Sequence, residues 1–411
     1  MQHSWTAALL LAALGSLSSA RPADPTLAEV VIRNFPAWDL NHDGVLTPSE
    51  VDQWVSDPAV KGQDAAAIAT IKLAMRRKTD PIKKLSRDQI EQAAGGSQVQ
   101  GAPEKEKEAD GHGDLGEDDL GPRSAAELQK RYKAAVRKIE HRQAEAFTDT
   151  APDIKSFHQG PLGDCYFVSM VGAMAHHEPD RLASLISVRE DGSYVVKFAG
   201  AKEPAVVPPL TDAQVVIAST AGKDGLWLPI IENGYGELRK STKPERADDE
   251  ATDLIAKGGY AGETIELLTG HDATRLGLGG VPSKPLKDEE LAQRAAKVRE
   301  LLPDLLSRKR LVGVGTAKDA KLPPGVNPSH AYAVLEFDPA TDTVTVWNPH
   351  GNTFKPKGEE GLANGYVTKG GIFHMQVPDL VRVFRGLVWE TDKPAVPNAP
   401  RKKPAAKTTT T

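Results

Sequence analysis

The stretch that decides the fold is Gln159-Gly160-Pro161-Leu162-Gly163-Asp164-Cys165-Tyr166-Phe167-Val168, where a turn rich in glycine and proline runs into an apolar helical pattern. The pattern places Cys165 at a helix N-terminus, where free N–H groups and the helix dipole favour a thiolate. The Cys165 N–H and the Gln159 amide can both face a developing oxyanion. The alternative is a cysteine buried as a small hydrophobe. Because Cys165 is the only cysteine of 411 residues and follows such a turn, we predict a nucleophile.

A nucleophilic thiol needs a general base, and His330 is the candidate. The sequence predicts a β-hairpin over residues 329–348 with a turn near its middle. If Phe337 pairs with Thr343, His330 and Asn348 share one face as diagonal neighbours, so Asn348 can orient the imidazole. A slip of one residue would place the two side chains on opposite faces. Taken singly, each would more often be a polar residue at the end of a strand.

A second motif lies near the N-terminus, between two segments with helical patterns. Residues 39–50 fit the twelve-residue EF-hand loop, and Gly44 permits the sharp turn at its sixth position. The alternative is an acidic turn without a metal. The partner loop expected at residues 78–89 has Lys78 and Gln89 where acidic ligands should stand, so we expect one Ca²⁺ ion. Its expected ligands are Asp39, Asn41, Asp43, the Val45 carbonyl, Thr47 and Glu50.

Composition changes along the chain predict its domain organisation. Residues 1–20 resemble a secretory signal, because the apolar run is too short for a membrane helix, which needs about 20 residues. Residues 21–94 read as a small all-α EF-hand-like domain, and residues 95–123 as an acidic, glycine-rich linker. Residues 124–390 form the main domain, and residues 391–411 a disordered tail. We expect a flexible tether between the two domains and no docking surface.

At this point the sequence resembles a known family. The blocks around Cys165, His330 and Asn348 are similar, in the same order, to the cysteine, histidine and asparagine blocks of the calpain-type cysteine proteases. Residues 226–235 resemble a further block of that family, and residues 258–270 resemble its acidic glycine-containing segment. The resemblance covers roughly residues 150–390.

The resemblance implies an α+β, papain-like fold, with a helical subdomain carrying Gln159 and Cys165 and a β-rich subdomain carrying His330 and Asn348. It implies a calcium-dependent cysteine endopeptidase acting on polypeptides, in which Gln159 helps to hold the oxyanion. Two departures are evident. Tyr166 follows the cysteine where the family usually has Trp, and His350 stands where a Trp usually shields the histidine–asparagine contact.

The net charge and the composition limit the kinds of binding partner that we expect. The formal charge of −5 gives no reason to expect a nucleic acid, and no run is long enough for a membrane span. The main expectation is therefore a secreted or cell-envelope protease of undetermined oligomeric state. Two alternatives stay open: a Cys-His-Asn enzyme that transfers or hydrolyses a non-peptide amide, and an inactive calcium-binding protein that only binds polypeptides.

Overall fold

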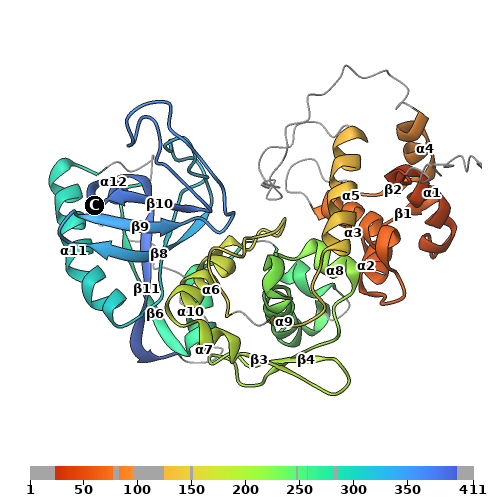
Figure 1. The fold of residues 1–411 in the computed structure, drawn as a ribbon, viewed down its shortest axis with the longest axis horizontal. Helices are drawn as coiled ribbons and strands as arrows, with labels where there is room; N and C mark the ends of the chain where they lie inside the picture. Colours follow the sequence, from red (N-terminus) through yellow and green to blue (C-terminus); the bar gives the residue numbers. More distant parts are fainter. Residues whose placement is uncertain are drawn as a thin grey trace, which may run out of the picture.

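The computed structural model describes residues 24–76, 83–95, 125–148, 151–246, 249–256, 258–280 and 286–395. The expected signal peptide, Lys78, nearly all of the expected linker and the tail beyond residue 395 lie outside these ranges. The described part is a mixed α/β structure with an N-terminal group of helices, a central helical part and a six-stranded sheet (Figure 1). No helix in these ranges is long and apolar enough to cross a membrane.

The N-terminal region consists of helices around two very short strands. Thr26 and Thr47 each begin a helix with a reciprocal capping box, closed by Glu29 and Glu50. The strands pair antiparallel, Leu46 opposite Leu85. The elements are α1 (Leu27–Trp38), β1 (Val45–Leu46), α2 (Pro48–Ser56), α3 (Gly62–Arg76), β2 (Leu85–Ser86) and α4 (Arg87–Gly95).

The central part surrounds α6, the helix that begins at Cys165. Its residues from Tyr166 to Ala175 are all buried, so it is a core helix rather than a surface one. A small antiparallel sheet, in the order β3-β4-β5, packs against helix α9. The elements are α5 (Ala125–Glu140), α6 (Cys165–His177), α7 (Pro179–Ala183), β3 (Ile186–Val188), β4 (Tyr194–Val196), β5 (Ala205–Val207), α8 (Asp212–Ile217), η2 (Gly222–Asp224), α9 (Trp227–Ser241), η3 (Pro244–Arg246), η4 (Ala251–Leu254) and α10 (Ala261–Thr269).

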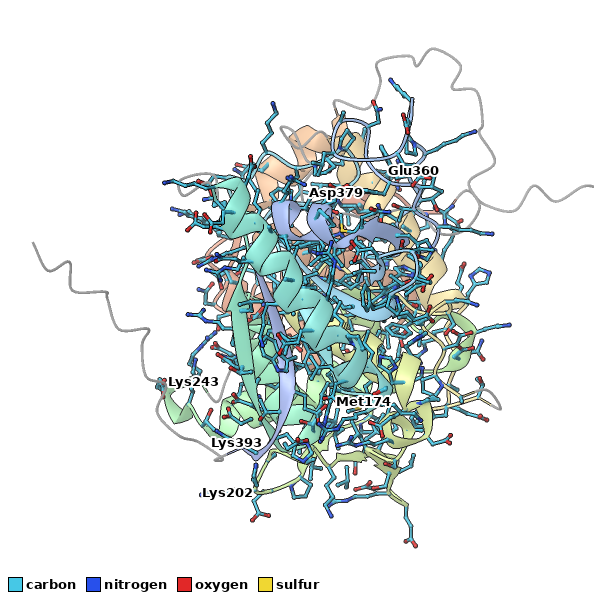
Figure 2. All side chains as sticks on the ribbon, turned by 90° about the vertical axis from the view of Figure 1, so that its left-hand side faces the viewer. Met174, Lys202, Lys243, Glu360, Asp379 and Lys393 are labelled. Carbon is cyan, nitrogen blue, oxygen red and sulfur yellow. The ribbon has the colours of Figure 1, made fainter. Side chains whose placement is uncertain are left out.

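The C-terminal part is a six-stranded antiparallel sheet in the order β10-β9-β8-β7-β11-β6. Figure 2 shows the long helix α11 lying over this sheet, with Glu360 and Lys393 at opposite ends of the view. The elements are β6 (His271–Gly277), α11 (Asp288–Ser307), β7 (Val312–Gly315), β8 (Ala331–Asp338), β9 (Thr343–Trp347), β10 (Ile372–Gln376), α12 (Val377–Val383) and β11 (Gly386–Pro394).

The two faces of the sheet belong to two different hydrophobic cores. Along β8, Tyr332 and Val334 pack into a core with α11 and α12. Ala333 and Leu335 point the other way, into the core that contains α6. On that face the ring of Trp347 lies against Gly172 of α6, where a Cβ would meet the ring at 2.2 Å. A glycine at this point lets the helix approach the sheet closely.

The expected independence of the N-terminal helices is wrong. Helix α3 packs against α5 and α8, and Ile68 and its neighbours are fully buried in the core shared with α6. Lys72 binds Asp253 at 2.6 Å, and Arg76 binds Glu250 at 2.7 Å. The two basic residues look like solvated cations in the sequence, because their acidic partners in and beside η4 lie more than 170 residues further on.

A second difference concerns the C-terminal boundary. The tail was expected to begin at Thr391, but β11 continues to Pro394, which pairs with His271 of β6. The carboxylate of Asp392 binds both Arg308 and Arg310. These ion pairs hold the last residues of the strand on the sheet, whereas composition alone suggested a solvated segment.

Candidate active site

The turn before α6 brings Gln159 and Cys165 to the edge of the sheet part. The Gln159 backbone N–H donates to the Pro349 carbonyl at 2.7 Å, which joins the turn to the segment after β9. The Gln159 side-chain amide donates to the Leu162 carbonyl within the turn. Cys165 is the first residue of α6 and is half-buried, unlike the residues that follow it. Its thiol therefore keeps partial access to the surface.

His330 and Asn348 are in direct contact. His330 immediately precedes β8, Asn348 immediately follows β9, and the His330 Nε2 lies 2.8 Å from the Asn348 Oδ1. Their side chains are 6% and 1% exposed, so this hydrogen bond is shielded from water. The expected contact between the two residues is present.

The hairpin register explains how the contact arises. Near the turn, Thr343 pairs with Asp338, one residue away from the expected Phe337. A bulge between Val334 and Glu336 then shifts the register by one residue, so that Val334 pairs with Val346 and Ala333 with Trp347. Beyond the bulge the pairing equals the expected one. The error at the turn is thus cancelled before the strand reaches His330.

The Asn348 side chain is fixed by four hydrogen bonds, including the one with His330. Its Oδ1 also accepts the His350 backbone N–H at 3.0 Å, and its Nδ2 donates to the Oδ1 atoms of Asn327 and Asn352, at 3.1 and 3.0 Å. This network assigns the amide orientation. The His330 Nε2 must therefore carry the proton that Asn348 accepts, which leaves Nδ1 of the neutral ring as an acceptor. Sequence reasoning missed Asn327 and Asn352, whose positions in polar turns gave only a weak signal.

The surroundings of His330 favour its neutral form. Burial lowers its pKa well below the usual value, the neighbouring His350 lowers it further, and only the bond to Asn348 opposes these effects. The two imidazole rings lie with centroids 4.2 Å apart and planes inclined by 35°. Tyr332 packs edge-on against His330 on another side, at 4.9 Å. A neutral imidazole with a free acceptor nitrogen is suited to take a proton.

Two observations bring Cys165 to the same place. Helix α6 packs against β8, the strand that starts just after His330. Burial raises the pKa of Tyr332, a backbone hydrogen bond with Asn327 lowers it, and the charge of Cys165 raises it, so Cys165 acts on the ring that contacts His330. A thiol at a helix N-terminus, an imidazole and an oriented amide therefore gather at one junction between α6 and the sheet. Such a set of groups is suited to nucleophilic acyl transfer.

Comparison with known proteins agrees with this geometry. The family model described as calpain family cysteine protease matches residues 120–388, which include the Cys165 turn, His330 and Asn348. The chain belongs to this family. It is 24% identical over 256 residues to the calpain-type cysteine protease DEK1 of Arabidopsis thaliana, and 24% identical over 257 residues to DEK1 of Zea mays. The calpain-type cysteine protease ADL1 of Oryza sativa subsp. japonica is 24% identical over 256 residues.

These alignments cover 56% of this calpain-family chain and 11% of each relative. The chain thus spans about a tenth of the length of the curated relatives that it matches. The similarity concerns the protease domain.

The two departures from the usual calpain pattern each have a defined place. Tyr166 is 2% exposed, its hydroxyl donates to the Ile255 carbonyl at 3.2 Å, and its ring lies against Gly259, where a Cβ would clash at 2.4 Å. Gly259 is thus required by close approach to the ring. The His350 ring lies tilted against the His330 ring, and the His350 backbone N–H donates to the Asn348 Oδ1. It therefore covers part of the histidine with a ring that can itself be charged.

In the predicted calcium loop, the carboxylate side chains accept hydrogen bonds from backbone N–H groups of the same loop. The Asp39 Oδ2 accepts the Gly44 N–H at 2.8 Å, and the Glu50 Oε1 accepts the Leu40 N–H at 3.0 Å. Asp39 and Glu50 are 5% and 6% exposed, and no Lys, Arg or His of the described residues forms an ion pair with either. In the partner loop, the Gln89 Oε1 accepts the Ser86 N–H at 2.9 Å. Within the described ranges, no three His, Cys, Asp or Glu side chains are grouped as metal ligands.

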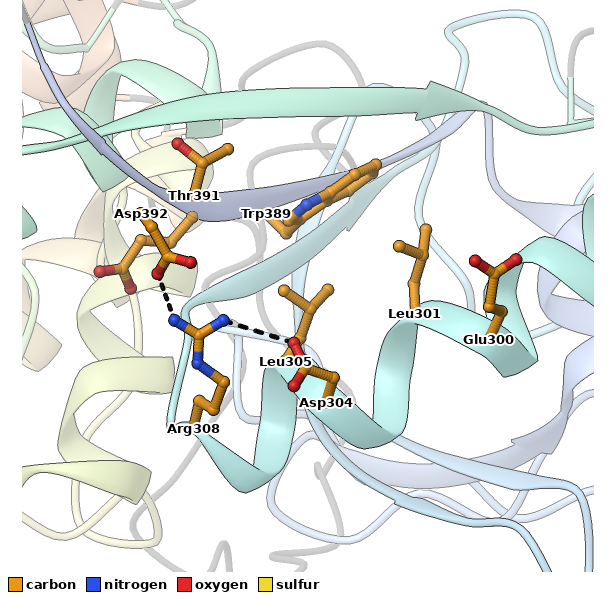
Figure 3. Close-up of a pocket in the computed structure, with 9 residues that line it drawn as sticks. Glu300, Leu301, Asp304, Leu305, Arg308, Trp389, Thr391 and Asp392 are labelled. Atoms are coloured by element: carbon orange, nitrogen blue, oxygen red, sulfur yellow. Dashed lines mark hydrogen bonds and ion pairs between the residues drawn. The ribbon is translucent and has the colours of Figure 1, made fainter.

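A pocket of about 380 Å³ lies elsewhere, between α11 and β11 (Figure 3). Figure 3 shows Arg308 between Asp304 and Asp392, and Trp389 forms another part of the wall. None of the predicted site residues lines this pocket. Its ion pairs hold β11 against α11, and we assign it no part in the chemistry at Cys165.

Proposed function

We propose that this chain is a calpain-like endopeptidase that hydrolyses polypeptides with Cys165 as nucleophile, His330 as general base and acid, and Asn348 as the group that orients His330. The observation that carries the proposal is the buried bond of 2.8 Å between the His330 Nε2 and the Asn348 Oδ1, beside the helix that starts at Cys165. That bond leaves the Nδ1 of His330 to exchange protons with the thiol.

The proposed reaction has two halves. In the first, the Cys165 sulfur attacks the peptide carbonyl carbon, and its proton passes through His330 to the leaving amine as the C–N bond breaks. In the second, His330 takes a proton from a water molecule that attacks the thioester. The acid product then leaves and the thiol regains its proton.

Stabilisation of the oxyanion is proposed for the Cys165 backbone N–H and the Gln159 side chain. Gln159 is 5% exposed, and its amide nitrogen carries two hydrogens, of which the Leu162 carbonyl takes one. The second hydrogen supports the proposed role. Removal of such a donor typically lowers kcat by about 10²–10³-fold.

The test is the cleavage of an unfolded polypeptide by the parent, Cys165→Ala and Asn348→Ala. We expect no cleavage with Cys165→Ala and a fall of about 10²-fold or more with Asn348→Ala. Ser184→Ala, an exposed substitution on a helix end, serves as the control. A parent that leaves the polypeptide intact but becomes acylated at Cys165 by an activated amide would favour the non-peptide amide. A parent that does neither would favour a binding protein without catalysis.

We also propose that the loop of residues 39–50 binds one Ca²⁺ ion through Asp39, Asn41, Asp43, the Val45 carbonyl, Thr47 and Glu50. Oxygen donors of this kind suit a hard cation. The support is that Asp39 and Glu50 are almost buried and lack a basic partner among the described residues, a situation in which a bound metal commonly balances the charge. Calcium would supply positive charge and hold the two ends of the loop together.

Calorimetry can test the calcium proposal. We expect one ion for each parent chain and none for Glu50→Gln, because a bidentate carboxylate is needed at the last loop position. Glu29→Gln is a matched control, since Glu29 closes the same kind of capping box on α1 outside the loop. Binding that survives Glu50→Gln, or that is lost equally in Glu29→Gln, would contradict the assignment.

Export is proposed from the N-terminal residues alone, since residues 1–20 read as a cleavable signal. Sequencing the N-terminus of the protein from its natural source tests it. A mature chain that begins near residue 21 supports export, and one that retains Met1 contradicts it.

A further inference from the structure

The turn that carries the nucleophile is held at its first end by a buried carboxyl group. Glu232 in α9 is fully buried, and its Oε2 accepts the Ser219 N–H at 2.8 Å. The Ser219 hydroxyl in turn accepts the Gly160 N–H at 2.9 Å. A Cβ on Gly160 would lie 2.5 Å from the Ala218 carbonyl oxygen, so the turn is pressed closely against this support. Gly160 is the neighbour of Gln159.

The same carboxyl group reaches the other end of the turn. Asp164 precedes Cys165, is fully buried and makes no side-chain cap bond to α6. Burial raises the pKa of Glu232, and hydrogen bonding with Ser219 and with the Asp164 carboxyl lowers it. Two carboxyl groups can form such a bond only if one of them carries a proton.

The charges around the pair are consistent with one shared proton. The groups that face Glu232 are Asp164 from the turn, Ser219 and Lys138 from α5. The Lys138 ammonium donates to the carbonyls of Ala218 and Val216, at 2.6 and 3.3 Å. Burial lowers the pKa of Lys138 to about 8, although Glu232 opposes the fall; below that pH, one proton on the pair leaves a single negative charge facing a single positive charge. With none, the buried site would hold an unbalanced carboxylate, which is costly in a protein interior.

We propose that Glu232 is a positioning residue that shares one proton with Asp164 and, through Ser219, fixes both ends of the turn from Gln159 to Cys165. The proposal rests on the proposed function of Cys165. It assigns to Glu232 no contact with substrate. Loss of the shared proton as pH rises sets two carboxylates against each other directly behind Cys165, so the turn moves and turnover falls.

The first test compares kcat and KM across pH for Glu232→Gln, Glu232→Ala and the control Glu237→Gln. A glutamine can donate to the Asp164 carboxylate and accept the Ser219 N–H, as protonated Glu232 does, but it cannot lose that proton. We therefore expect Glu232→Gln to turn over without the decline that loss of this proton causes in the parent as pH rises. Glu232→Ala should lower kcat by about tenfold or more with little change in KM. Glu237→Gln, one turn further along α9, should retain the parent profile.

A parent-like decline with rising pH in Glu232→Gln, or a Glu232→Ala change confined to KM, would overturn the proposal. Asp164→Asn moves the amide to the other partner and should remove the decline in the same way. A structural contribution alone would lower activity equally at every pH and would not be rescued by the amide.

The second test does not need activity, so it separates this inference from the proposed function. In Cys165→Ala protein, the free energy of unfolding should contain a part that is present below the pKa of an unfolded glutamate, about 4.3, and lost as pH rises through the raised pKa of buried Glu232. Adding Glu232→Gln should remove this part. If it does so while the parent shows no peptidase activity, the proposed function fails and the shared proton stands. If both proteins show the same pH dependence, the shared proton is refuted.

Discussion

The two sides of the candidate site are held in different ways. His330 and Asn348 sit on a sheet whose outer face is closed by α11 and α12, and their contact is fixed by hydrogen bonds from neighbouring turns. Cys165 begins a helix whose core continues into the N-terminal helices as far as Val30. The outer face of the histidine side is therefore closed by helices of the protease domain, whereas the cysteine side packs against a region outside the matched protease domain. Destabilising the N-terminal helices should disturb the position of Cys165 more than that of His330.

Removal of residues 1–95 should have the largest effect. It strips α3 from α5 and α8 and exposes apolar surface that is buried in the parent. We expect loss of essentially all peptidase activity, with aggregation or loss of structure on the cysteine side. Activity assays and hydrogen exchange can be applied to the shortened chain. A shortened protein that keeps activity within about tenfold, roughly 1.4 kcal/mol of barrier, would show that the two regions are independent after all.

Lys72→Met tests the dependence at one residue. The Lys72 side chain is 3% exposed and contacts both Asp52 of α2 and Asp253 of η4. Removing one partner of a buried ion pair typically costs about 3–5 kcal/mol, because the remaining charges stay buried. Denaturant unfolding measures the loss, and hydrogen exchange should place it in α3 and η4 rather than in β8 and β9.

Lys61→Met is the matched control, since Lys61 is 55% exposed and lies 3.8 Å from Asp212. A surface pair contributes about 0–1 kcal/mol. Equal losses in the two variants would mean that the buried network does not hold the regions together.

Asp52→Asn should change how stability varies with pH. Burial raises the pKa of Asp52 to about 6, although Lys72 acts against the rise. The folded protein then binds a proton that the unfolded chain releases near pH 3.9, so this contribution is present below about pH 4 and lost as pH rises through about 6. As pH rises from 4 to 7, the unfolding free energy of the variant should increase by about 2–3 kcal/mol relative to that of the parent. A variant that loses unfolding free energy relative to the parent over this pH range would mean that the effect of Lys72 on the Asp52 pKa outweighs the effect of burial.

The smallest expected effect is on the histidine side. His350→Trp removes a ring that lowers the pKa of His330. The limb of the pH–rate profile that reports His330 should therefore move to higher pH, while kcat at the optimum changes little. The control His141→Gln alters an exposed histidine at the end of α5. An unshifted limb, or a fall in the stability of the N-terminal helices, would contradict the separation of the two sides.

The sequence predicted the local features of the site well. Helix α6 begins at Cys165 because a turn of Gly, Pro and Asp stops and an apolar run begins, and such signals lie within ten residues. The contact of His330 with Asn348 could also be predicted, since hairpin pairing follows from the alternation of residues around a turn. The family model then confirmed the resemblance to calpain-type proteases.

Long-range contacts were the part that could not be predicted. Nothing near Lys72 indicates that Asp253 will pair with it, and nothing near Glu232 indicates that it will meet Asp164 and Ser219. Isolated charged residues read as solvated, because that is their usual state. Their burial follows from the packing of helices far apart in the chain, which sequence periodicity does not specify. The calcium loop and the signal segment stay predictions.

The bulge in β8 has a consequence for protein engineering. The skipped residue, Leu335, takes up a length mismatch of one residue between the hairpin turn and the strand ends that carry His330 and Asn348. The turn at residues 338–342 can therefore be lengthened or grafted as long as this offset is restored upstream. Deleting Leu335 would make Val334–Val346 and Glu336–Thr345 consecutive pairs, so the strand would become regular while His330 keeps its place beside Asn348.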